Sequence, residues 1–586
     1  MNKSNYDKYP YIRVSDRSDD CLAGWDAICD GIKLRLMSPG SSPATVVIEC
    51  YQGVLEDEIV EALQSRFEQA TVVRSAGAMK PAAEINNFFR DDITGDELFG
   101  YMTRHNIDSY FDPVRTEDLR RQIRSQQADV TFIVGTGAAH VCPDARLLIY
   151  ADMARWEIQQ RFRRSEVANT GAGNRDERAS LQYKRAFFVD WRICDRFKKS
   201  LMKRWDYVLD TCAAGRPKMI TRRLFEEGLA KAAGCPFRVA PFFDPGPWGG
   251  QWMKEVFDLD RKAVNYAWCF DCVPEENSLL LGFGDIRFEI PAIDLVFAHP
   301  RELLGDAVHG RFGDEFPIRF DFLDTMQGGN LSLQVHPPTE YIQEKFGMHY
   351  TQDESYYILD AGDDACVYLG LKDGVNPEAM LSDLRTAQKS GTFDAEKYAC
   401  RYPIKKHDHI LIPAGTVHCS GANSMVLEIS ATPFIFTFKL WDWGRLGLDG
   451  RPRPLNIDHG ARSIQWNRTE SWVKREILNR AEEIVKGDGW TEERTGLHER
   501  EFIETRRHRF TGAVRHRTGG GVNVLNLIEG REATVESPHN AFEPFVVHYA
   551  ETFIVPAGVD EYIIRPSGES EGQRCATIKA YIRNQA

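Results

Sequence analysis

Short apolar runs alternate with amphipathic segments in the part of the chain that begins at Ala44. The run ATVVIEC at residues 44–50 predicts a buried strand, and apolar residues recur at helical spacing in EDEIVEALQSRFEQ at residues 56–69. Further strands are predicted at residues 71–75, 129–137, 145–152 and 205–210. Strands and helices that alternate in this way are typical of a parallel α/β sheet.

The pattern differs on both sides of this part. Residues 1–43 lack it, and we expect an irregular leader with one candidate helix around residues 23–36. After Cys235 the Pro- and Gly-rich stretch PFFDPGPWGG at 241–250 predicts a linker. Short strands with turn signals then dominate and predict an antiparallel β architecture. Helical passages are expected at residues 300–306, 340–346, 377–388 and 472–486.

One phrase occurs twice in the β-rich part. ILIPAGTVH at residues 410–418 and FIVPAGVDE at residues 553–561 predict the same strand, turn and strand. Two related β units are therefore expected. The second phrase has Glu561 where the first has His418, so a metal in the first unit is not expected in the second.

Composition narrows the function classes. Hydrophobic residues make up 42% and charged residues 27% of the 586 residues, which is typical of globular protein with several cores. The net charge of -13 argues against a nucleic-acid binder. No apolar run is long enough to span a membrane, and the thirteen cysteines are scattered, so we expect a cytoplasmic protein. The isolated CxxC of Cys269 and Cys272 is expected to be a pair of buried thiols.

Three separate segments carry candidate metal ligands. In LSLQVHPP, Gln334 and His336 are two residues apart, so on a strand both point to one face. Glu354 begins the next predicted strand, and His418 follows the turn PAG. A single histidine of this kind is more often a core residue than a ligand. Two imidazoles, a carboxylate and an amide oxygen together suit a cation such as Zn²⁺.

These segments belong to a longer series of ordered motifs, which resembles the class I mannose-6-phosphate isomerases from about residue 242 to residue 461. The motifs are WGG (248–250), FP and LD around a strand (316–317, 323–324), LSLQVHP (331–337), ESYYILD (354–360), IPAGTVH (412–418), LEI (427–429) and DWGRLGLDGRPRPL (442–455). NLIEG at residues 526–530 and VPAGVDEY at residues 555–562 extend the resemblance more weakly.

The resemblance implies a double cupin, a pair of β-barrels, in which Gln334, His336, Glu354 and His418 bind one zinc ion per chain. It also implies an aldose–ketose isomerase, with mannose 6-phosphate and fructose 6-phosphate as the default pair, that acts through an enediolate. The implied site residues are as follows: Glu428 as the base, Arg445 and Lys439 as further catalytic residues, and Ser332, Lys439 and Gln352 as substrate-binding residues. For Glu428 an exposed carboxylate, and for Arg445 a structural ion pair, remain alternatives.

The fold class expected is therefore multidomain, an α/β domain followed by a mainly β double cupin with a helical insertion. The expected segments are a leader (1–43), an α/β domain (44–235), a catalytic cupin (236–465) and a C-terminal cupin without metal (466–586).

The chain departs from the family at positions that concern phosphate. Relatives have lysines where this chain has Asp321 and Gln352, and an arginine where it has Lys439. Other cations could replace them, with Arg319, Lys345 and Lys405 as candidates. Alternatively, the substrate is another or an unphosphorylated sugar, or the protein is a sugar-binding regulator without turnover.

The α/β domain shows strand, turn and helix in the order found in nucleotide kinases. The phosphate-binding signature G-x-x-x-x-G-K-[ST] is missing from its first turn, where Glu56 and Asp57 stand instead. The GTG at residues 135–137 is weak evidence, and the segment with Asp152 and Arg155 faintly resembles a kinase lid. We expect a degenerate kinase-like domain that serves assembly, regulation or ligand sensing, while the oligomeric state stays open.

Overall fold

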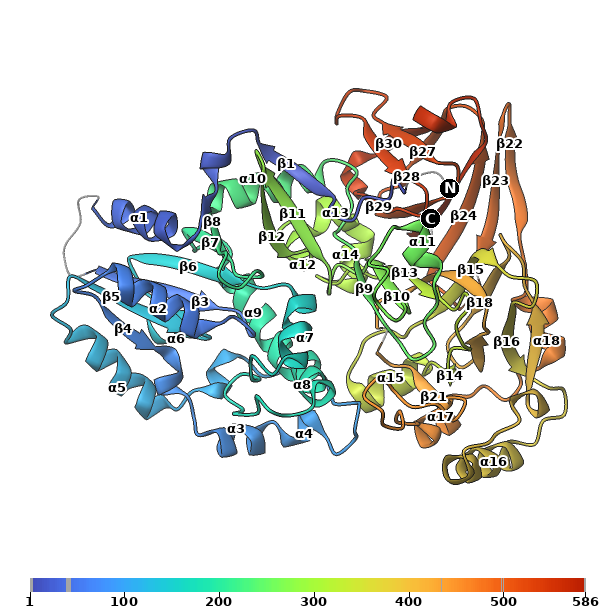
Figure 1. Cartoon of the computed structure of the whole chain (residues 1–586), viewed down its shortest axis with the longest axis horizontal. Helices are drawn as coiled ribbons and strands as arrows, with labels where there is room; N and C mark the ends of the chain where they lie inside the picture. The colour runs from blue at the N-terminus through green and yellow to red at the C-terminus, as the bar shows by residue number, and fades with distance from the viewer. Residues whose placement is uncertain (1–3, 38–43, 434, 497, 499, 584–586) are drawn as a thin grey trace. The chain divides into compact units, whose positions relative to one another are not determined.

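The computed structural model describes residues 4–37, 44–433, 435–496, 498 and 500–583, and divides into two compact units (Figure 1). The α/β unit comprises Tyr11–Lys231 and Ser278–Ala298. The double-barrel unit comprises the chain up to Pro10, Ala232–Asn277 and the chain from His299 onward.

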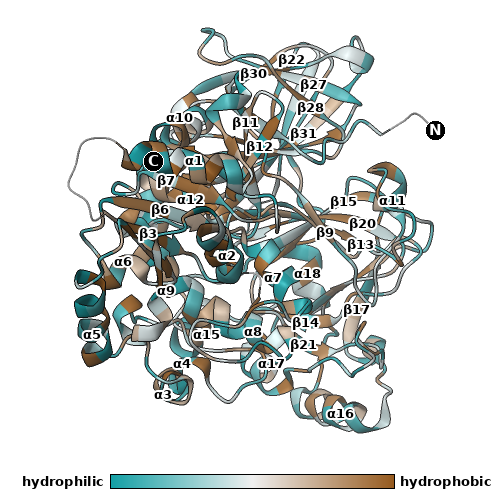
Figure 2. Ribbon diagram, turned by 60° about the vertical axis from the view of Figure 1, so that its left-hand side comes forward, coloured by the Kyte–Doolittle hydropathy of each residue, from teal (hydrophilic) through white to brown (hydrophobic). Residues whose placement is uncertain are grey.

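A seven-stranded sheet in the order β2-β8-β7-β6-β3-β5-β4 forms the centre of the α/β unit. The five strands predicted from the sequence are present and pair in parallel. They are β3 (Ala44–Cys50), β4 (Thr71–Arg74), β5 (Val130–Gly135), β6 (Leu147–Asp152) and β7 (Tyr207–Asp210). The helices between them include α2 (Glu56–Arg66), α5 (Pro113–Arg124), α7 (Arg155–Arg163) and α9 (Trp191–Leu201). Figure 2 shows hydrophobic colour along β3 and β6 and hydrophilic colour on much of α5, as expected for a buried sheet under surface helices.

The helix expected in the leader is present, but the leader also contains strands, which corrects the expectation that the rest of it is irregular. It contains β1 (Tyr11–Ser15), β2 (Leu22–Ala23) and α1 (Trp25–Leu36), while residues 1–3 and 38–43 lie outside the described residues. β2 extends the large sheet through β8 (Lys218–Thr221). β1 pairs in parallel with β11 (Ser278–Phe283), which pairs with β12 (Ile286–Pro291). Residues 278–298, expected in the catalytic cupin, therefore belong to the α/β unit.

A buried ionic cluster fastens this late segment to the sheet of the α/β unit. The Lys198 ammonium on α9 lies 2.7 Å from Asp152 at the end of β6 and 2.9 Å from Asp294 on α12 (Ile293–Ala298). All three side chains are at most 1% exposed. Because removing one member would leave a buried charge unpaired, the cluster makes the position of α12 specific.

Two sheets form the first barrel of the double-barrel unit. The six-stranded sheet has the order β18-β15-β20-β13-β10-β9, and the five-stranded sheet has the order β17-β16-β19-β14-β21. Their strands are β9 (Phe242–Asp244), β10 (Trp268–Cys272), β13 (Ile318–Asp324), β14 (Leu333–Val335), β15 (Glu354–Ala361), β16 (Cys366–Leu371), β17 (Ala399–Pro403), β18 (His409–Ile412), β19 (His418–Ser420), β20 (Ser424–Ala431) and β21 (Phe438–Trp441). The predicted helices at 300–306, 340–346 and 377–388 correspond to α13 (Pro300–Leu304), α15 (Thr339–Phe346) and α16 (Pro377–Ser390).

The second barrel has a six-stranded sheet, β22-β23-β24-β31-β26-β29, and a four-stranded sheet, β25-β30-β27-β28. Its strands are β22 (Glu482–Gly487), β23 (Trp490–Gly496), β24 (Ile503–Phe510), β25 (Val514–Arg517), β26 (Asn523–Glu529), β27 (Glu532–Glu536), β28 (Phe545–His548), β29 (Thr552–Val555), β30 (Glu561–Pro566) and β31 (Cys575–Ile582). The helix expected at 472–486 is wrong in its second half, because α18 covers Glu470–Glu476 and β22 follows.

The repeated phrase has the same structural role in both barrels. β18 and β19 belong to opposite sheets of the first barrel, and β29 and β30 belong to opposite sheets of the second. Glu561, the counterpart of His418, binds Arg517 at 2.5 Å near the surface.

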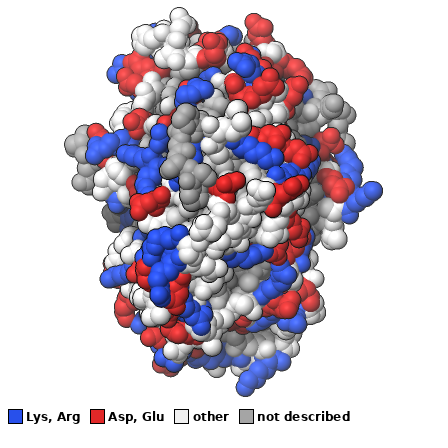
Figure 3. All heavy atoms as spheres, turned by 90° about the vertical axis from the view of Figure 1, so that its left-hand side faces the viewer, with Lys and Arg blue, Asp and Glu red and all other residues white. Residues whose placement is uncertain are grey.

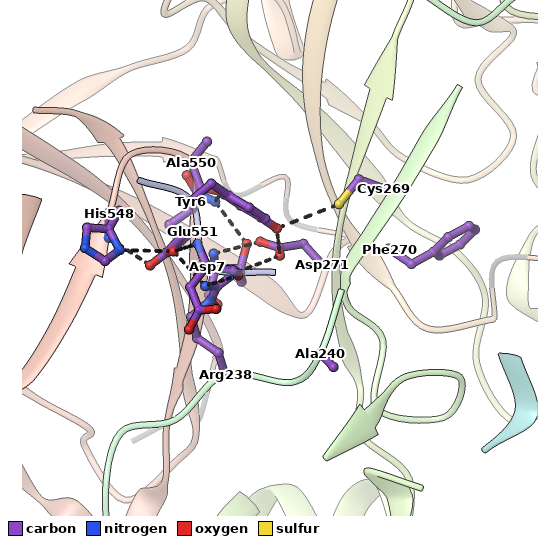
Figure 4. Close-up of polar contacts among 12 residues, drawn as sticks. Tyr6, Asp7, Arg238, Ala240, Cys269, Phe270, Asp271, His548, Ala550 and Glu551 are labelled. Carbon is purple, nitrogen blue, oxygen red and sulfur yellow. Dashed lines mark hydrogen bonds and ion pairs between the residues drawn. The ribbon is translucent and has the colours of Figure 1, made fainter. Parts of the chain in front are cut away.

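A buried arginine joins the two barrels to the N-terminal segment (Figure 4). Arg238 lies 2.8 Å from Glu551, just before β29, and 3.4 Å from Asp271 on β10. Tyr6 donates a hydrogen bond to the same Asp271 at 2.5 Å. All four side chains are buried, so the network fixes the barrels and residues 6–7 to one another.

On the face drawn in Figure 3, acidic and basic side chains are intermixed. Among the described residues, no helix has the length and apolar character needed to cross a membrane. All thirteen cysteines are free, and both Cys269 and Cys272 are buried.

Candidate metal centre

The four predicted ligands come from both sheets of the first barrel. Gln334 on β14 lies directly opposite His418, the first residue of β19. His336 follows β14 by one residue, and Glu354 begins β15 of the other sheet. The alternation of side chains along β14 directs both Gln334 and His336 to the interior, as the sequence spacing predicted.

The structure brings these side chains together in a buried cluster. Ligand atoms of His336, Glu354 and His418 all lie within 4.8 Å of one another. The Glu354 Oε1 atom is 3.2 Å from His336 Nε2 and 2.6 Å from His418 Nε2. The amide nitrogen of Gln334 is 3.1 Å from His418 Nε2. Each of the four residues is at most 6% exposed.

Hydrogen bonds to backbone carbonyls orient both imidazoles. His336 Nδ1 lies 3.2 Å from the carbonyl oxygen of Phe436, and His418 Nδ1 lies 2.9 Å from that of Thr416. A carbonyl only accepts, so each Nδ1 carries the proton. In the neutral rings, both Nε2 lone pairs therefore point at Glu354, the arrangement that second-shell partners impose on metal-binding histidines.

These donor atoms fit a metal ion. Lone pairs of two imidazoles and a carboxylate face one another, and in the described structure His336 Nε2 and Glu354 Oε1 have no hydrogen-bond partner. Burial opposes ionisation of Glu354, but positive charge on His336 and His418, when these rings are protonated, holds its pKa well below the ordinary value. Rotation of the Gln334 amide by half a turn would present its oxygen to the same point. Nitrogen and oxygen donors of this kind suit zinc.

The predicted base, Glu428, is buried and held by three donors rather than exposed. Its Oε1 atom accepts from Arg319 at 2.8 Å, Ser430 at 2.9 Å and Gln352 at 3.1 Å. Gln352 also donates to Glu354 Oε2 at 3.1 Å. Burial raises the pKa of Glu428 well above its ordinary value, although Arg319 lowers it. Gln352 thus connects the predicted base to a candidate metal ligand.

Arg319 explains how Asp321 can stand in the barrel interior. Both residues lie on β13 and face the same side, and the Arg319 guanidinium binds Asp321 at 2.8 Å and Glu428 at 2.8 Å. Arg319 was one of the cations expected to replace the missing lysines. Its charge is engaged by these two carboxylates.

The predicted residues Lys439 and Arg445 lie in a second group beside the ligands. Lys439 on β21 is opposite Gln334 on β14. Arg445 binds Asp442 at 2.5 Å and donates to the carbonyl of Asn330. Arg453 binds the other oxygen of Asp442 at 2.9 Å. Burial, with Arg453 and Arg445 nearby, lowers the pKa of Lys439 to about 8, although Asp442 acts in the opposite direction.

Sequence reasoning had singled out neither Asp442 nor Arg453. Both belong to the quoted motif DWGRLGLDGRPRPL, so the signal was available. Ser332 donates to the Gln334 amide oxygen at 3.0 Å and thereby sits next to the ligands. The other two cations expected to replace the missing lysines lie at the surface. Lys345 pairs with Glu344 on α15, and Lys405 is exposed.

The α/β unit has its own cavity, of about 300 Å³, where β3 and β5 end. Its lining includes Gln52, Glu56, Arg74, Thr136, Asn169 and Arg175. Glu49 accepts from the backbone nitrogens of Gly137 at 2.6 Å and Ala139 at 2.7 Å, and Glu56 accepts from that of Thr136 at 3.1 Å. Carboxylates of the chain itself, those of Glu49 and Glu56, therefore accept the hydrogen bonds that the backbone N–H groups in and after the GTG turn could donate to a ligand.

The two residues that suggested a kinase lid are part of the interior of the α/β unit. Asp152 binds Lys198, and Arg155 binds Asp195 at 2.5 Å. Both Asp152 and Arg155 are at most 2% exposed. Ion pairs buried in this way stabilise the fold, whereas residues of a lid would need to move. We therefore assign Asp152 and Arg155 a structural role.

Comparison with known proteins gives different matches for the α/β part of the chain and for the chain as a whole. A domain of unknown function (DUF8485) matches residues 24–234. In sequence, the chain is 26% identical over 236 residues to the mannose-6-phosphate isomerase ManA of Bacillus subtilis, a match that covers 39% of this chain and 68% of the relative. The mannose-6-phosphate isomerase of Streptococcus mutans is 26% identical over 237 residues, which cover 39% of this chain and 69% of the relative.

Solved structures similar to this chain also include mannose 6-phosphate isomerases. The mannose 6-phosphate isomerase of Bacillus subtilis has a TM-score of 0.48 and 21% identity, and the match covers 59% of this chain and all of the other. A zinc-bound mannose 6-phosphate isomerase has a TM-score of 0.45 and 14% identity. The sequence similarities support a sugar-phosphate isomerase, and the buried His336, Glu354 and His418 cluster supports a metal cofactor.

Proposed function

We propose that the double-barrel unit is a zinc-dependent aldose–ketose isomerase of a hexose phosphate, with mannose 6-phosphate and fructose 6-phosphate as the substrate pair. The observation that carries the proposal is the convergence of Glu354 and two Nε2 lone pairs at one buried point. The sequence similarity to mannose-6-phosphate isomerases supports the substrate class.

Gln334, His336, Glu354 and His418 would hold the ion, one per chain. A bound Zn²⁺ supplies Lewis acidity toward the substrate oxygens on C1 and C2 and stabilises negative charge that develops there. The carbonyls of Phe436 and Thr416 keep the imidazoles in the ligating tautomer. This support reduces the reorganisation needed when the ion binds.

Glu428 is the proposed proton carrier between C1 and C2. A base must lie near the metal without binding it. Gln352 donates hydrogen bonds to both Glu354 and Glu428 and so keeps Glu428 next to a metal ligand. Arg319 and Ser430 fix the carboxylate from the other side. Gln352 is therefore proposed to position the base as well as to contact the sugar.

The group around Lys439 is the proposed site for the substrate's anionic end. Lys439, Arg445 and Arg453 carry three positive charges, and Asp442 compensates one of them. Ser332 adds a hydroxyl beside Gln334. Charge-assisted contacts of this kind select a phosphate over a hydroxyl.

Turnover of mannose 6-phosphate by the zinc-loaded full chain tests the proposal. We expect Glu428→Gln to reduce kcat by about 10²-fold or more, as loss of general base catalysis does, while one zinc per chain is retained. Ser382→Ala, an exposed substitution on α16, is the matched control. Full activity of Glu428→Gln would remove Glu428 from the mechanism.

A second candidate function is a sugar-binding regulator without turnover. Asp321 and Gln352, which replace two lysines of the family, favour it, because they remove positive charge from the barrel interior. Tight binding of mannose 6-phosphate with no fructose 6-phosphate formed would support this function. Turnover of free mannose in place of the phosphate ester would identify an unphosphorylated substrate.

A further inference from the structure

The inner faces of the second-barrel strands change from apolar to polar along the barrel. Phe510, Val514 and Cys575 belong to one buried hydrophobic cluster. On the same face of each of these strands, two residues away, the side chain is polar: His508 beside Phe510, His516 beside Val514, and Thr577 beside Cys575. Since side chains alternate along a strand, these three polar residues face the interior as well.

The polar residues form a compact group. His508 on β24 lies directly opposite Thr577 on β31. Its ring centroid is 4.4 Å from that of His516 on β25, and His516 stacks on Tyr562 at 5.1 Å. His508, His516 and Thr577 are at most 4% exposed.

Three atoms of this group have no partner. Among the described residues, His508 Nδ1, His516 Nε2 and Thr577 Oγ1 are buried without a hydrogen bond. Buried polar atoms are normally paired, so three neighbouring exceptions indicate a missing partner. A ligand with several oxygens would satisfy all three.

Lys579 supplies a positive charge next to this group. It lies two residues beyond Thr577 on the same face of β31 and is 8% exposed. Its ammonium donates to no carboxylate in the described structure and lies 5.5 Å from the Tyr581 ring centroid. Two carboxylates lie nearby. Glu492 contacts Arg506 at 3.2 Å and also His508, a member of this group, at 3.5 Å. Glu504 pairs with the same Arg506.

The Lys579 ammonium, which has no ion-pair partner among the described residues, favours an anion over a cation at this group. Burial, together with His508 and Lys579, lowers the pKa of His516 well below its ordinary value. Burial also lowers the pKa of Lys579 to about 8, against the attraction of Glu492. A metal ion would be repelled by the ammonium, whereas an anion would be attracted and could accept hydrogen bonds from Lys579 and Thr577.

We propose that the second barrel binds a small oxyanion, such as a phosphate or carboxylate group, between His508, His516, Thr577 and Lys579. This site is separate from the candidate metal centre and does not depend on the proposed isomerase activity. The partly exposed Glu492 and Arg506, at 21% and 17% of their side chains, stand at its rim.

Calorimetric titration of the zinc-loaded full chain with inorganic phosphate tests the site, with acetate as the carboxylate probe. We expect Lys579→Met to weaken this binding about tenfold or more, because a charge-assisted contact is lost. Lys579→Arg should retain it, and Thr577→Val should weaken it without removing charge. The proposal is supported if phosphate or acetate binds and the variants change its affinity in this way. The probe that binds identifies the class of oxyanion.

His418→Ala separates the second barrel from the first. Phosphate binding that persists in His418→Ala and weakens in Lys579→Met assigns the site to the second barrel. The proposal is overturned if Lys579→Met and Thr577→Val, folded by their circular dichroism, bind phosphate and acetate as the unchanged chain does. It is also overturned if His418→Ala abolishes all binding.

Discussion

Lys439 lies directly opposite Gln334 across the antiparallel pair β21 and β14. One interstrand spacing, about 5 Å between the two backbones, thus separates a candidate metal ligand from the cation proposed to hold the substrate's anionic end. If the proposed substrate binds here, its reacting carbons and its phosphate would each lie next to one of these two strands. A single rigid sheet can therefore orient both ends of the substrate.

The pKa of Lys439 predicts an alkaline limit of activity. Burial lowers this pKa to about 8, so the ammonium loses its proton as the pH rises through that value. We expect kcat/KM for mannose 6-phosphate to fall above pH 8 by about tenfold per pH unit, since this ratio reports the free enzyme. In Lys439→Arg, which stays charged, the decline should disappear. An unchanged alkaline decline in Lys439→Arg would assign it to another group, and Lys345→Met on the surface is the control.

Metal content should depend on His418 and Glu354. We expect about one zinc per chain in the purified protein, and less than a tenth of that in His418→Ala or Glu354→Ala, because three or four donors are needed for tight binding. Elemental analysis after dialysis gives the readout. His407→Ala is the matched control, since His407 bonds Tyr357 and lies outside the cluster. Full zinc content in His418→Ala would show that the ion binds elsewhere.

The candidate metal centre was accessible from sequence because its spacing obeys local rules. Gln334 and His336 share a strand face, and His418 ends a turn that Pro413 and Gly415 mark. The turn is as expected, since Gly415 has a φ of 92°. These local patterns made the residues candidates, and the resemblance to the class I mannose-6-phosphate isomerases joined them with Glu354 into one predicted ligand set.

Other features have no local signal. β1 and β11 pair across most of the α/β unit's sequence, and neither strand carries information about its partner. The pairing of Arg319 with Glu428 depends on the register of β13 against β20, which places Glu428 opposite Asp321. The sequence predicts a helix where β22 stands, because EEIVK contains helix-forming residues, and the pairing of β22 with β23 overrides that propensity.

Arg319 should stabilise the first barrel strongly. Arg319→Met leaves Asp321 and Glu428 buried without their cation, and we expect a loss of about 3–5 kcal/mol in the free energy of unfolding. Denaturant unfolding followed by tryptophan fluorescence measures it. Arg385→Met, which removes an exposed pair with Asp458, should cost at most about 1 kcal/mol. Equal effects of the two substitutions would contradict the buried role of Arg319.

The α/β unit should not consume ATP. Phosphate in doubly wound folds binds at backbone N–H groups where the central strands end, and here Glu49 and Glu56 already accept from Thr136, Gly137 and Ala139. Burial raises the pKa of Glu49 to about 8, against the two N–H bonds that lower it. We expect no ADP from ATP, with or without mannose, in a coupled assay. Sugar-dependent ADP formation by the purified chain would overturn this expectation.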